Sequence, residues 1–98
     1  MVVGVWMVEL HMPYAQNLKD KRNILQSILT KSRSRYNVSI AELGYHDKWQ
    51  RSIMGVACVD SESCRAENIF SAIRKIFEEN GMVIVVKENI NFYSLEDR

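Results

Sequence analysis

The sequence predicts an α+β fold in which two helices cover one face of a four-stranded antiparallel sheet. Three observations lead to this prediction. Segments rich in β-branched and aromatic residues occur together with two segments whose apolar residues recur at intervals of three and four. The order along the chain is strand, helix, strand, strand, helix, strand. We expect all 98 residues to form one domain, residues 1–98, which is long enough to bury a hydrophobic core.

The first helix is predicted from Leu18 to about Arg35. Asn17 is a suitable N-cap, and Asp20 stands three residues later in the position of a capping-box acid. Asn37 suits a left-handed residue that ends the helix. The apolar arc of this helix consists of Leu18, Ile24, Leu25, Ile28 and Leu29.

The remaining elements complete the pattern. Strand character is found in residues 2–11, 38–45, about 51–59 and 82–93. The second helix is expected to begin at Asp60, Ser61 or Ser63 and to end at Asn80-Gly81, because glycine adopts a positive φ at little cost. Its apolar positions are Ala66, Ile69, Phe70, Ile73, Ile76 and Phe77. Two right-handed strand–helix–strand units in this order form the ferredoxin-like plait.

Three of the predicted strands are apolar on both sides, whereas a sheet with one wet face should alternate apolar and polar residues. In the first strand, Val3, Val5 and Met7 are left on the side away from the helices. An exposed apolar face is typical of an interface, and two-fold self-association is the commonest assembly. We therefore expect a homodimer, formed face to face or edge to edge. The alternative is that the C-terminal segment NFYSLEDR folds across the sheet.

Composition excludes several classes of protein. The formal net charge of +1 provides no overall attraction for nucleic acid, so any basic surface must be local. The longest apolar stretch, MVVGVWMV, is too short to span a membrane, and no signal-peptide pattern surrounds it. Cys58 and Cys64 match neither a zinc site nor a disulfide framework. We expect a cytoplasmic protein with no membrane partner, metal or cofactor.

The first helix carries the strongest local charge in the chain. Its segment NLKDKRNILQSILTKSRSR contains six basic residues and one acid. The basic residues are Lys19, Lys21, Arg22, Lys31, Arg33 and Arg35. On a helical wheel Lys19, Arg22 and Arg33 lie on one flank of the apolar arc, and the other three lie on the opposite flank. These six residues are predicted to bind nucleic-acid phosphates; the alternative is a solvated face that only keeps the helix soluble.

The segment GYHDKWQRSIMG, residues 44–55, connects two predicted strands. His46 and Asp47 are adjacent, but no nucleophile or orienting group accompanies them, so they do not define a catalytic pair. Trp49 and Arg51 are of the types enriched at interface hot spots. We predict a hairpin in which Trp49 and Arg51 contact RNA or a protein. The alternative is a structural hairpin with a half-buried tryptophan. His11 is assigned no role.

Signatures of known activities on this fold are missing from the sequence. The third predicted strand, RSIMGVACV, lacks the aromatic platform of an RNA-recognition motif. The first loop has neither the Cys-x-x-Cys of a copper carrier nor the glycine-rich phosphate cradle of a small phosphatase. No Walker or dinucleotide-binding fingerprint occurs. We therefore predict no enzymatic activity and no catalytic residues.

Several stretches together resemble the YlxP-like family of small bacterial proteins, which is grouped under a domain of unknown function. They are MVVGV, ELHMP, NLKDKRNIL, YNVSIAELG and DKWQRSIMGVACV, within roughly residues 1–80. The family pattern usually has a serine and a glutamate at the first helix cap, where this chain has Asn17 and Asp20. The resemblance implies a ferredoxin-like plait. It also implies a place in ribosome maturation, because the family's genes commonly lie beside those for a translation initiation factor and a ribosome-binding factor.

From the residues and this resemblance we expect a non-enzymatic protein that binds ribosomal RNA or a ribosomal subunit. Two other classes stay open at this point. One is a dimeric module that senses a small molecule at the subunit interface, and the other is a protein-interaction module. The sequence separates these alternatives poorly, because fold alone does not define function.

Overall fold

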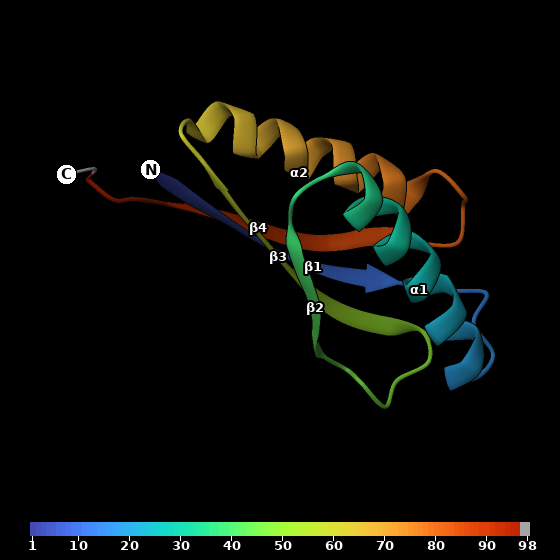
Figure 1. Cartoon of the computed structure of the whole chain (residues 1–98). Helices are drawn as coiled ribbons and strands as arrows, with labels where there is room; N and C mark the ends of the chain where they lie inside the picture. Colours follow the sequence, from blue (N-terminus) through green and yellow to red (C-terminus); the bar gives the residue numbers. More distant parts are fainter. Residues whose placement is uncertain (97–98) are drawn as a thin grey trace.

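The computed structural model describes residues 1–96 and confirms the predicted fold class. The elements in chain order are β1 (Val2–His11), α1 (Leu18–Arg35), β2 (Ser39–Gly44), β3 (Arg51–Asp60), α2 (Ser63–Glu78) and β4 (Ile84–Ser94). The strands form one sheet in the order β2-β3-β1-β4, and every neighbouring pair is antiparallel. Figure 1 shows this ferredoxin-like arrangement, in which both helices lie on the same side of the sheet.

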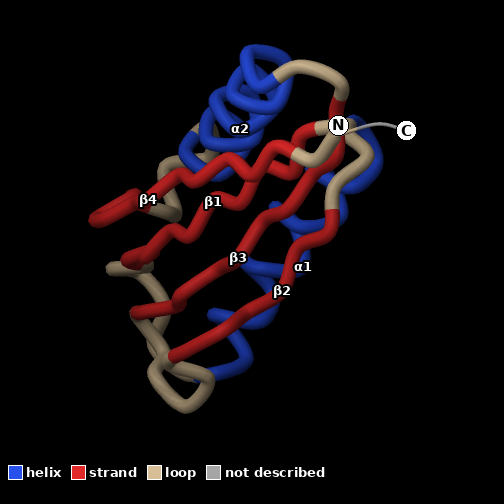
Figure 2. Tube along the Cα trace, turned by 90° about the vertical axis from the view of Figure 1, so that its left-hand side faces the viewer, coloured by secondary structure: helices blue, strands red, loops and turns tan. Residues whose placement is uncertain are grey.

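The hydrophobic core lies between the helices and the sheet. Helix α2 packs against β1, β3 and β4, and α1 packs against α2 and β2 (Figure 2). At the centre, the ring of Trp6 packs against Phe70 and Phe77, with centroid separations of 5.9 and 5.6 Å. Alternate residues of β1 face this core because successive side chains of a strand point to opposite faces. Trp6, Val8 and Leu10 are fully buried as a result.

The predicted N-terminal cap of α1 is present, whereas the predicted C-terminal cap is not. The side-chain oxygen of Asn17 accepts a hydrogen bond from the Asp20 amide at 2.8 Å, and the Asp20 carboxylate accepts one from the Gln16 amide at 3.0 Å. The helix ends at Tyr36, whose backbone is extended with φ −134° and ψ 144°. The prediction of a left-handed Asn37 is therefore wrong: among non-glycine residues 1–96, Tyr45 has the positive φ. Gly81 has the predicted positive φ, 72°.

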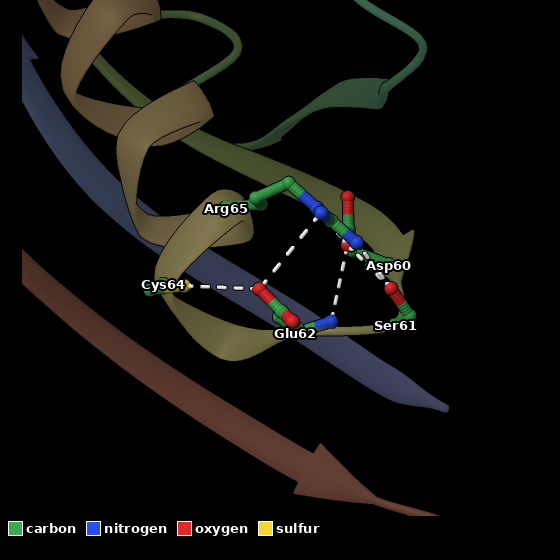
Figure 3. A network of polar contacts seen from close by, with 5 residues as sticks. All are labelled: Asp60, Ser61, Glu62, Cys64 and Arg65. Atoms are coloured by element: carbon green, nitrogen blue, oxygen red, sulfur yellow. Dashed lines mark hydrogen bonds and ion pairs between the residues drawn. The ribbon is translucent and has the colours of Figure 1, made fainter.

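The start of α2 depends on Asp60 without using it as the cap. The helix begins at Ser63, and its N-cap Glu62 makes no capping hydrogen bond through its side chain. Instead, Oδ1 of Asp60 accepts hydrogen bonds from the Glu62 amide at 3.1 Å and from Nε of Arg65 at 2.9 Å (Figure 3). This network joins the end of β3 to the first turn of α2. The Arg65 guanidinium also lowers the pKa of Asp60 below its ordinary value of 3.8.

The face of the sheet that the helices leave uncovered is called here the open face. It is apolar along most of β1 and β3, as predicted, whereas β4 adds Lys87, Asn89 and Asn91 to it. Val3 of β1 lies opposite Val59 and Tyr93, and Met7 lies opposite Gly55. Three of these side chains are strongly exposed: Met7 by 48%, Val59 by 63% and Tyr93 by 57%. The open face is therefore available for a partner.

The alternative cover for this face, the C-terminal segment, is not supported. Residues 91–94 belong to β4 and pair with β1, so they extend the sheet rather than crossing it. The next amide, of Leu95, donates to the Met1 carbonyl at 2.8 Å. The last two residues of the segment NFYSLEDR lie outside the described residues. Within residues 1–96 no helix is long and apolar enough to cross a membrane.

Candidate functional site

The candidate site is built around the connection between β2 and β3, residues 45–50, called here the hairpin segment. It opens with a tight turn in which the Lys48 amide donates to the Tyr45 carbonyl at 3.0 Å. Tyr45 has a φ of 59°, in the left-handed region that a non-glycine residue rarely adopts. Such a conformation persists only where surrounding contacts hold it in place.

Those contacts come from a buried ionic group. Lys21 of α1 is only 2% exposed, and its Nζ lies 2.9 Å from Oε2 of Glu42 on β2. The same ammonium donates to the carbonyl of Tyr45 at 2.6 Å. Ser52 of β3, which is fully buried, donates to the same oxygen of Glu42 at 2.6 Å. Lys21 therefore holds β2, β3 and the hairpin segment against α1.

This position corrects the prediction that Lys21 contacts nucleic-acid phosphates. A cation that is 2% exposed and already bound to a carboxylate and a carbonyl has no free donor surface for a phosphate. The physical reason is that a charge inside a protein must be paired, because its loss of hydration is otherwise uncompensated. Lys21 is a positioning residue.

A second set of hydrogen bonds attaches the hairpin segment to the loop between β1 and α1. The Met12 amide donates to the Gln50 carbonyl at 2.8 Å. The side-chain amide of Gln50 donates to the carbonyls of Pro13 at 3.2 Å and Ala15 at 3.1 Å. Nδ1 of His11 lies 3.0 Å from the same Gln50 carbonyl. The hairpin segment is therefore held from two sides, by α1 and by the loop that precedes it.

An open cleft of about 470 Å³ lies at this end of the sheet. Its lining residues are His11, Asp47, Lys48, Trp49, Gln50 and Arg51. Trp49 is 52% exposed, and its ring packs against no other aromatic ring of the described residues. The cleft thus combines a large exposed aromatic surface with charges of both signs.

Arg51, the other predicted contact residue, is partly engaged. Its guanidinium lies 2.7 Å from a carboxylate oxygen of Glu9 and 4.4 Å from the centre of the Tyr45 ring. The hydrogen bond and charge of Glu9 raise the pKa of Arg51 above its ordinary value. The side chain is still 49% exposed. Arg51 therefore lines the cleft, and the carboxylate of Glu9 compensates its positive charge.

The remaining basic residues of α1 divide into two groups. On the α2 side, Nζ of Lys31 lies 2.5 Å from Glu79, and this contact together with the charge of Arg35 lowers the pKa of Glu79 below 4.5. On the β2 side, Arg22 and Arg33 line one groove of about 300 Å³. This shared groove confirms the prediction that Arg22 and Arg33 occupy the same flank. Arg33 also donates to the carbonyl of Ile40 at 2.8 Å.

Four of the six basic side chains are exposed and form no ion pair with a carboxylate of the described residues: Lys19, Arg22, Arg33 and Arg35. Lys48 of the hairpin segment is exposed and unpaired in the same sense. The first turns of α1 and the hairpin segment lie side by side in Figures 1 and 2. The contact of Lys21 with the Tyr45 carbonyl joins the same two segments, so the part of α1 that carries Lys19 and Arg22 lies beside the hairpin segment that carries Lys48 and Trp49.

The other reactive side chains have local partners. Nε2 of His46 lies 3.2 Å from the Glu42 carbonyl. Cys58 is buried, and burial together with the nearby Asp60 carboxylate raises the pKa of its thiol. Cys64 is exposed, and its Sγ donates to Glu62 at 3.5 Å (Figure 3). Within residues 1–96 no three metal-ligating side chains are clustered.

Sequence reasoning missed three residues that hold the hairpin segment in place: Glu42, Ser52 and Gln50. For Glu42, the position of Lys21 on the first helix offered a signal. The buried positions of α1 are Lys21, Leu25, Ile28 and Ser32, at intervals of four, three and four, so Lys21 lies on the core-facing stripe. A lysine on such a stripe requires an acid opposite it. No comparable pattern marks Gln50, whose role depends on where the β1–α1 loop passes.

The fold and this end of the sheet define a ferredoxin-like plait whose hairpin is fixed to its first helix. Residues 3–90 match the profile of the family described as "Protein of unknown function (DUF503)", and the chain therefore belongs to the DUF503 family. It is 47% identical over 53 residues to "Uncharacterized protein YlxP" of Bacillus subtilis (strain 168). That alignment spans 54% of this chain and 58% of the relative.

Solved structures support the fold. A de novo designed protein with the ferredoxin fold matches all of this chain and 96% of its own, with a TM-score of 0.61 and 14% identity. A dimeric ferredoxin-like protein from an uncultured marine organism matches 99% of this chain and 100% of its own, with a TM-score of 0.50 and 10% identity. At these identities the likeness is one of fold alone.

Proposed function

We propose that this protein is a non-enzymatic, cytoplasmic RNA-binding protein that associates with ribosomal RNA or a ribosomal subunit. The observation that carries the proposal is the set of four exposed α1 cations with no carboxylate partner in the described chain. Phosphate contacts of Lys and Arg supply most of the sequence-independent affinity for nucleic acid. Unpaired cations serve this purpose best, because no internal ion pair has to be broken first.

The contact surface in this proposal differs from the set of six residues expected from sequence. Lys19 and Arg22, together with Lys48 of the hairpin segment, form its centre. Arg33, on the same flank as Arg22, extends it along α1, whereas Arg35 lies on the opposite flank, near Glu79. Lys21 is buried beneath this surface in its ion pair with Glu42, and Lys31 is paired with Glu79.

The proposal is tested by co-sedimentation with ribosomal subunits at low and raised salt. Binding to one subunit that weakens with salt supports phosphate contacts, because released counterions make such affinity salt-dependent. The variant carries Lys19→Gln and Arg22→Gln. The matched control carries Arg65→Gln and Lys75→Gln, two exposed cations of α2 that lie outside both α1 and the open face.

The α1 variant is expected to bind more weakly than the control, although both lose two charges. For purified single-stranded RNA, the slope of log affinity against log salt should fall by about 1.4, or about 0.7 for each lost contact. Equal binding by the two variants would remove α1 from the interface. Absence of the wild-type protein from all ribosomal fractions at low salt would contradict the proposed function.

The proposal also includes a homodimer formed through the open face. Three strands of 10, 10 and 11 residues and one of 6, about 4.8 Å apart, cover roughly 600 Å², compared with about 800 Å² buried per partner in stable complexes. The face offers apolar side chains over much of this area, with Met7, Val59 and Tyr93 strongly exposed. Pairing of two such faces leaves the hairpin segment and α1 of each copy free for RNA.

A further inference from the structure

We propose that the cleft at the hairpin segment binds one unpaired nucleobase of a single-stranded RNA, stacked on the indole ring of Trp49. This inference rests on the proposed function and specifies the form of nucleic acid that the site takes. It goes beyond phosphate contact, because phosphate contacts alone do not distinguish single strands from duplexes.

The first argument is the unusual exposure of the Trp49 side chain. A tryptophan carries a large apolar surface and is usually largely buried, yet Trp49 is 52% exposed, while Trp6, the other tryptophan, is completely buried. Arg51, by contrast, already lies over the ring of Tyr45. Trp49 is thus left as the cleft's free aromatic surface within the described residues, and bases stack on such surfaces in single-strand sites.

The second argument is the mixture of charges around the ring. Lys48 is a free cation next to Trp49, suited to a phosphate, while Asp47 places a carboxylate in the same cleft. A simple anion site would not include an unpaired acid. A carboxylate instead suits the amino groups of a base, in the way that Asp and Glu accept hydrogen bonds from cytosine. The combination fits a nucleotide better than a free phosphate.

The third argument is rigidity and size. The hairpin segment is fixed by Lys21 at Tyr45 and by Gln50 at the β1–α1 loop, so the ring has a defined support. The cleft volume of about 470 Å³ falls within the range of small-ligand sites. It is open to solvent on one side, so the chain of a longer strand can continue beyond the bound nucleotide. A paired base in a duplex cannot reach the ring without leaving its stack.

The test uses intrinsic fluorescence, since the chain has two tryptophans in opposite environments. Single-stranded RNA is titrated into the full chain at low salt, alongside the same sequence annealed as a duplex and tripolyphosphate as a phosphate-only probe. Single-stranded RNA is expected to quench the emission of Trp49, and the other two probes are not. Labelled RNA measures affinity independently by anisotropy.

Two variants and one control separate stacking from folding. Trp49→Phe should abolish the quenching but keep affinity within about threefold, because phenylalanine also stacks. Trp49→Ala should weaken binding about tenfold. Phe92→Ala removes another exposed aromatic ring, which lies at the opposite end of the sheet and outside the open face, and it should leave affinity unchanged. Unchanged emission of Trp6 in the Trp49 variants reports an intact core.

Each outcome decides a different claim. RNA that binds without quenching, with Trp49→Ala and Phe92→Ala equal in affinity, overturns the stacking site but leaves phosphate binding by α1 standing. Equal quenching by the duplex, or by tripolyphosphate, overturns the assignment to an unpaired base. Failure of every RNA to bind overturns both this inference and the proposed function.

Discussion

The ammonium group of Lys21 lies 2.9 Å from a carboxylate oxygen of Glu42 and 2.6 Å from the carbonyl oxygen of Tyr45. Through these two contacts one side chain of α1 fixes both a strand and the unusual backbone of the following turn. The position of Trp49, four residues beyond Tyr45, depends on that turn. Stability and the geometry of the site are therefore coupled at Lys21.

Replacing Lys21 by methionine is expected to destabilise the protein by about 3 kcal/mol, because it leaves Glu42 and the Tyr45 carbonyl without their partner. Urea unfolding monitored by circular dichroism measures the effect. The matched control is Lys19→Met on the exposed side of α1, which should change the free energy of unfolding by less than about 0.5 kcal/mol. A Lys21→Met protein as stable as the control, but deficient in RNA binding, would show that Lys21 is a contact residue after all.

Acid is expected to weaken two surface ion pairs. Arg65 lowers the pKa of Asp60 below 3.8, and Lys31 lowers the pKa of Glu79 below 4.5. A carboxyl group whose pKa is lower in the folded state contributes stability above its unfolded pKa, and that contribution is lost as the pH falls through the folded pKa. The free energy of unfolding should therefore decrease below about pH 4.5.

The double variant Arg65→Met and Lys31→Met tests this assignment. Its difference in stability from the wild type should be greatest at neutral pH and should shrink as the pH falls through the lowered pKa values and the two carboxyl groups become protonated. Urea unfolding at a series of pH values measures the difference. A difference that stays constant across the series would assign the effect to packing of the long side chains instead.

Self-association should depend on the open face. Met7→Lys introduces a charge at the centre of that face, opposite Gly55, and is expected to convert a dimer to a monomer. Ser71→Lys, which adds the same charge at an exposed position of α2, should leave the dimer intact. Sedimentation equilibrium measures both. A monomeric wild type at high concentration, or an unchanged dimer in Met7→Lys, would rule out this interface.

The two thiols should differ in reactivity. Cys58 is buried and its pKa is raised by burial and by Asp60, so its reactive thiolate is scarce at neutral pH. Cys64 is exposed at the first turn of α2. An aromatic disulfide reagent should modify one thiol rapidly in the native protein and both in urea. Cys64→Ser should abolish the rapid phase, whereas a rapid phase that persists would place Cys58 at the surface.

The fold could be predicted because its signals are local. The 3.6-residue period of Ala66, Phe70, Ile73 and Phe77 and the alternation of β1 arise from burying one face of each element. Gly81 at the end of α2 follows in the same way from its freedom at positive φ. The apolar open face was visible in the sequence for the same reason. The prediction of a left-handed Asn37 was wrong because the chain leaves α1 in an extended conformation at Tyr36.

The sequence by itself thus determined the order of the elements, the core and which face of the sheet stays bare. The tertiary structure decided which charges remain free. Lys21 and Lys31 belong to the same basic segment as Lys19 and Arg22, but Glu42 and Glu79 lie opposite them only after folding. The pairing of charges far apart in the chain depends on the packing of α1 against β2 and α2. For that reason composition revealed a basic helix, and the fold alone selected the residues that remain available to a partner.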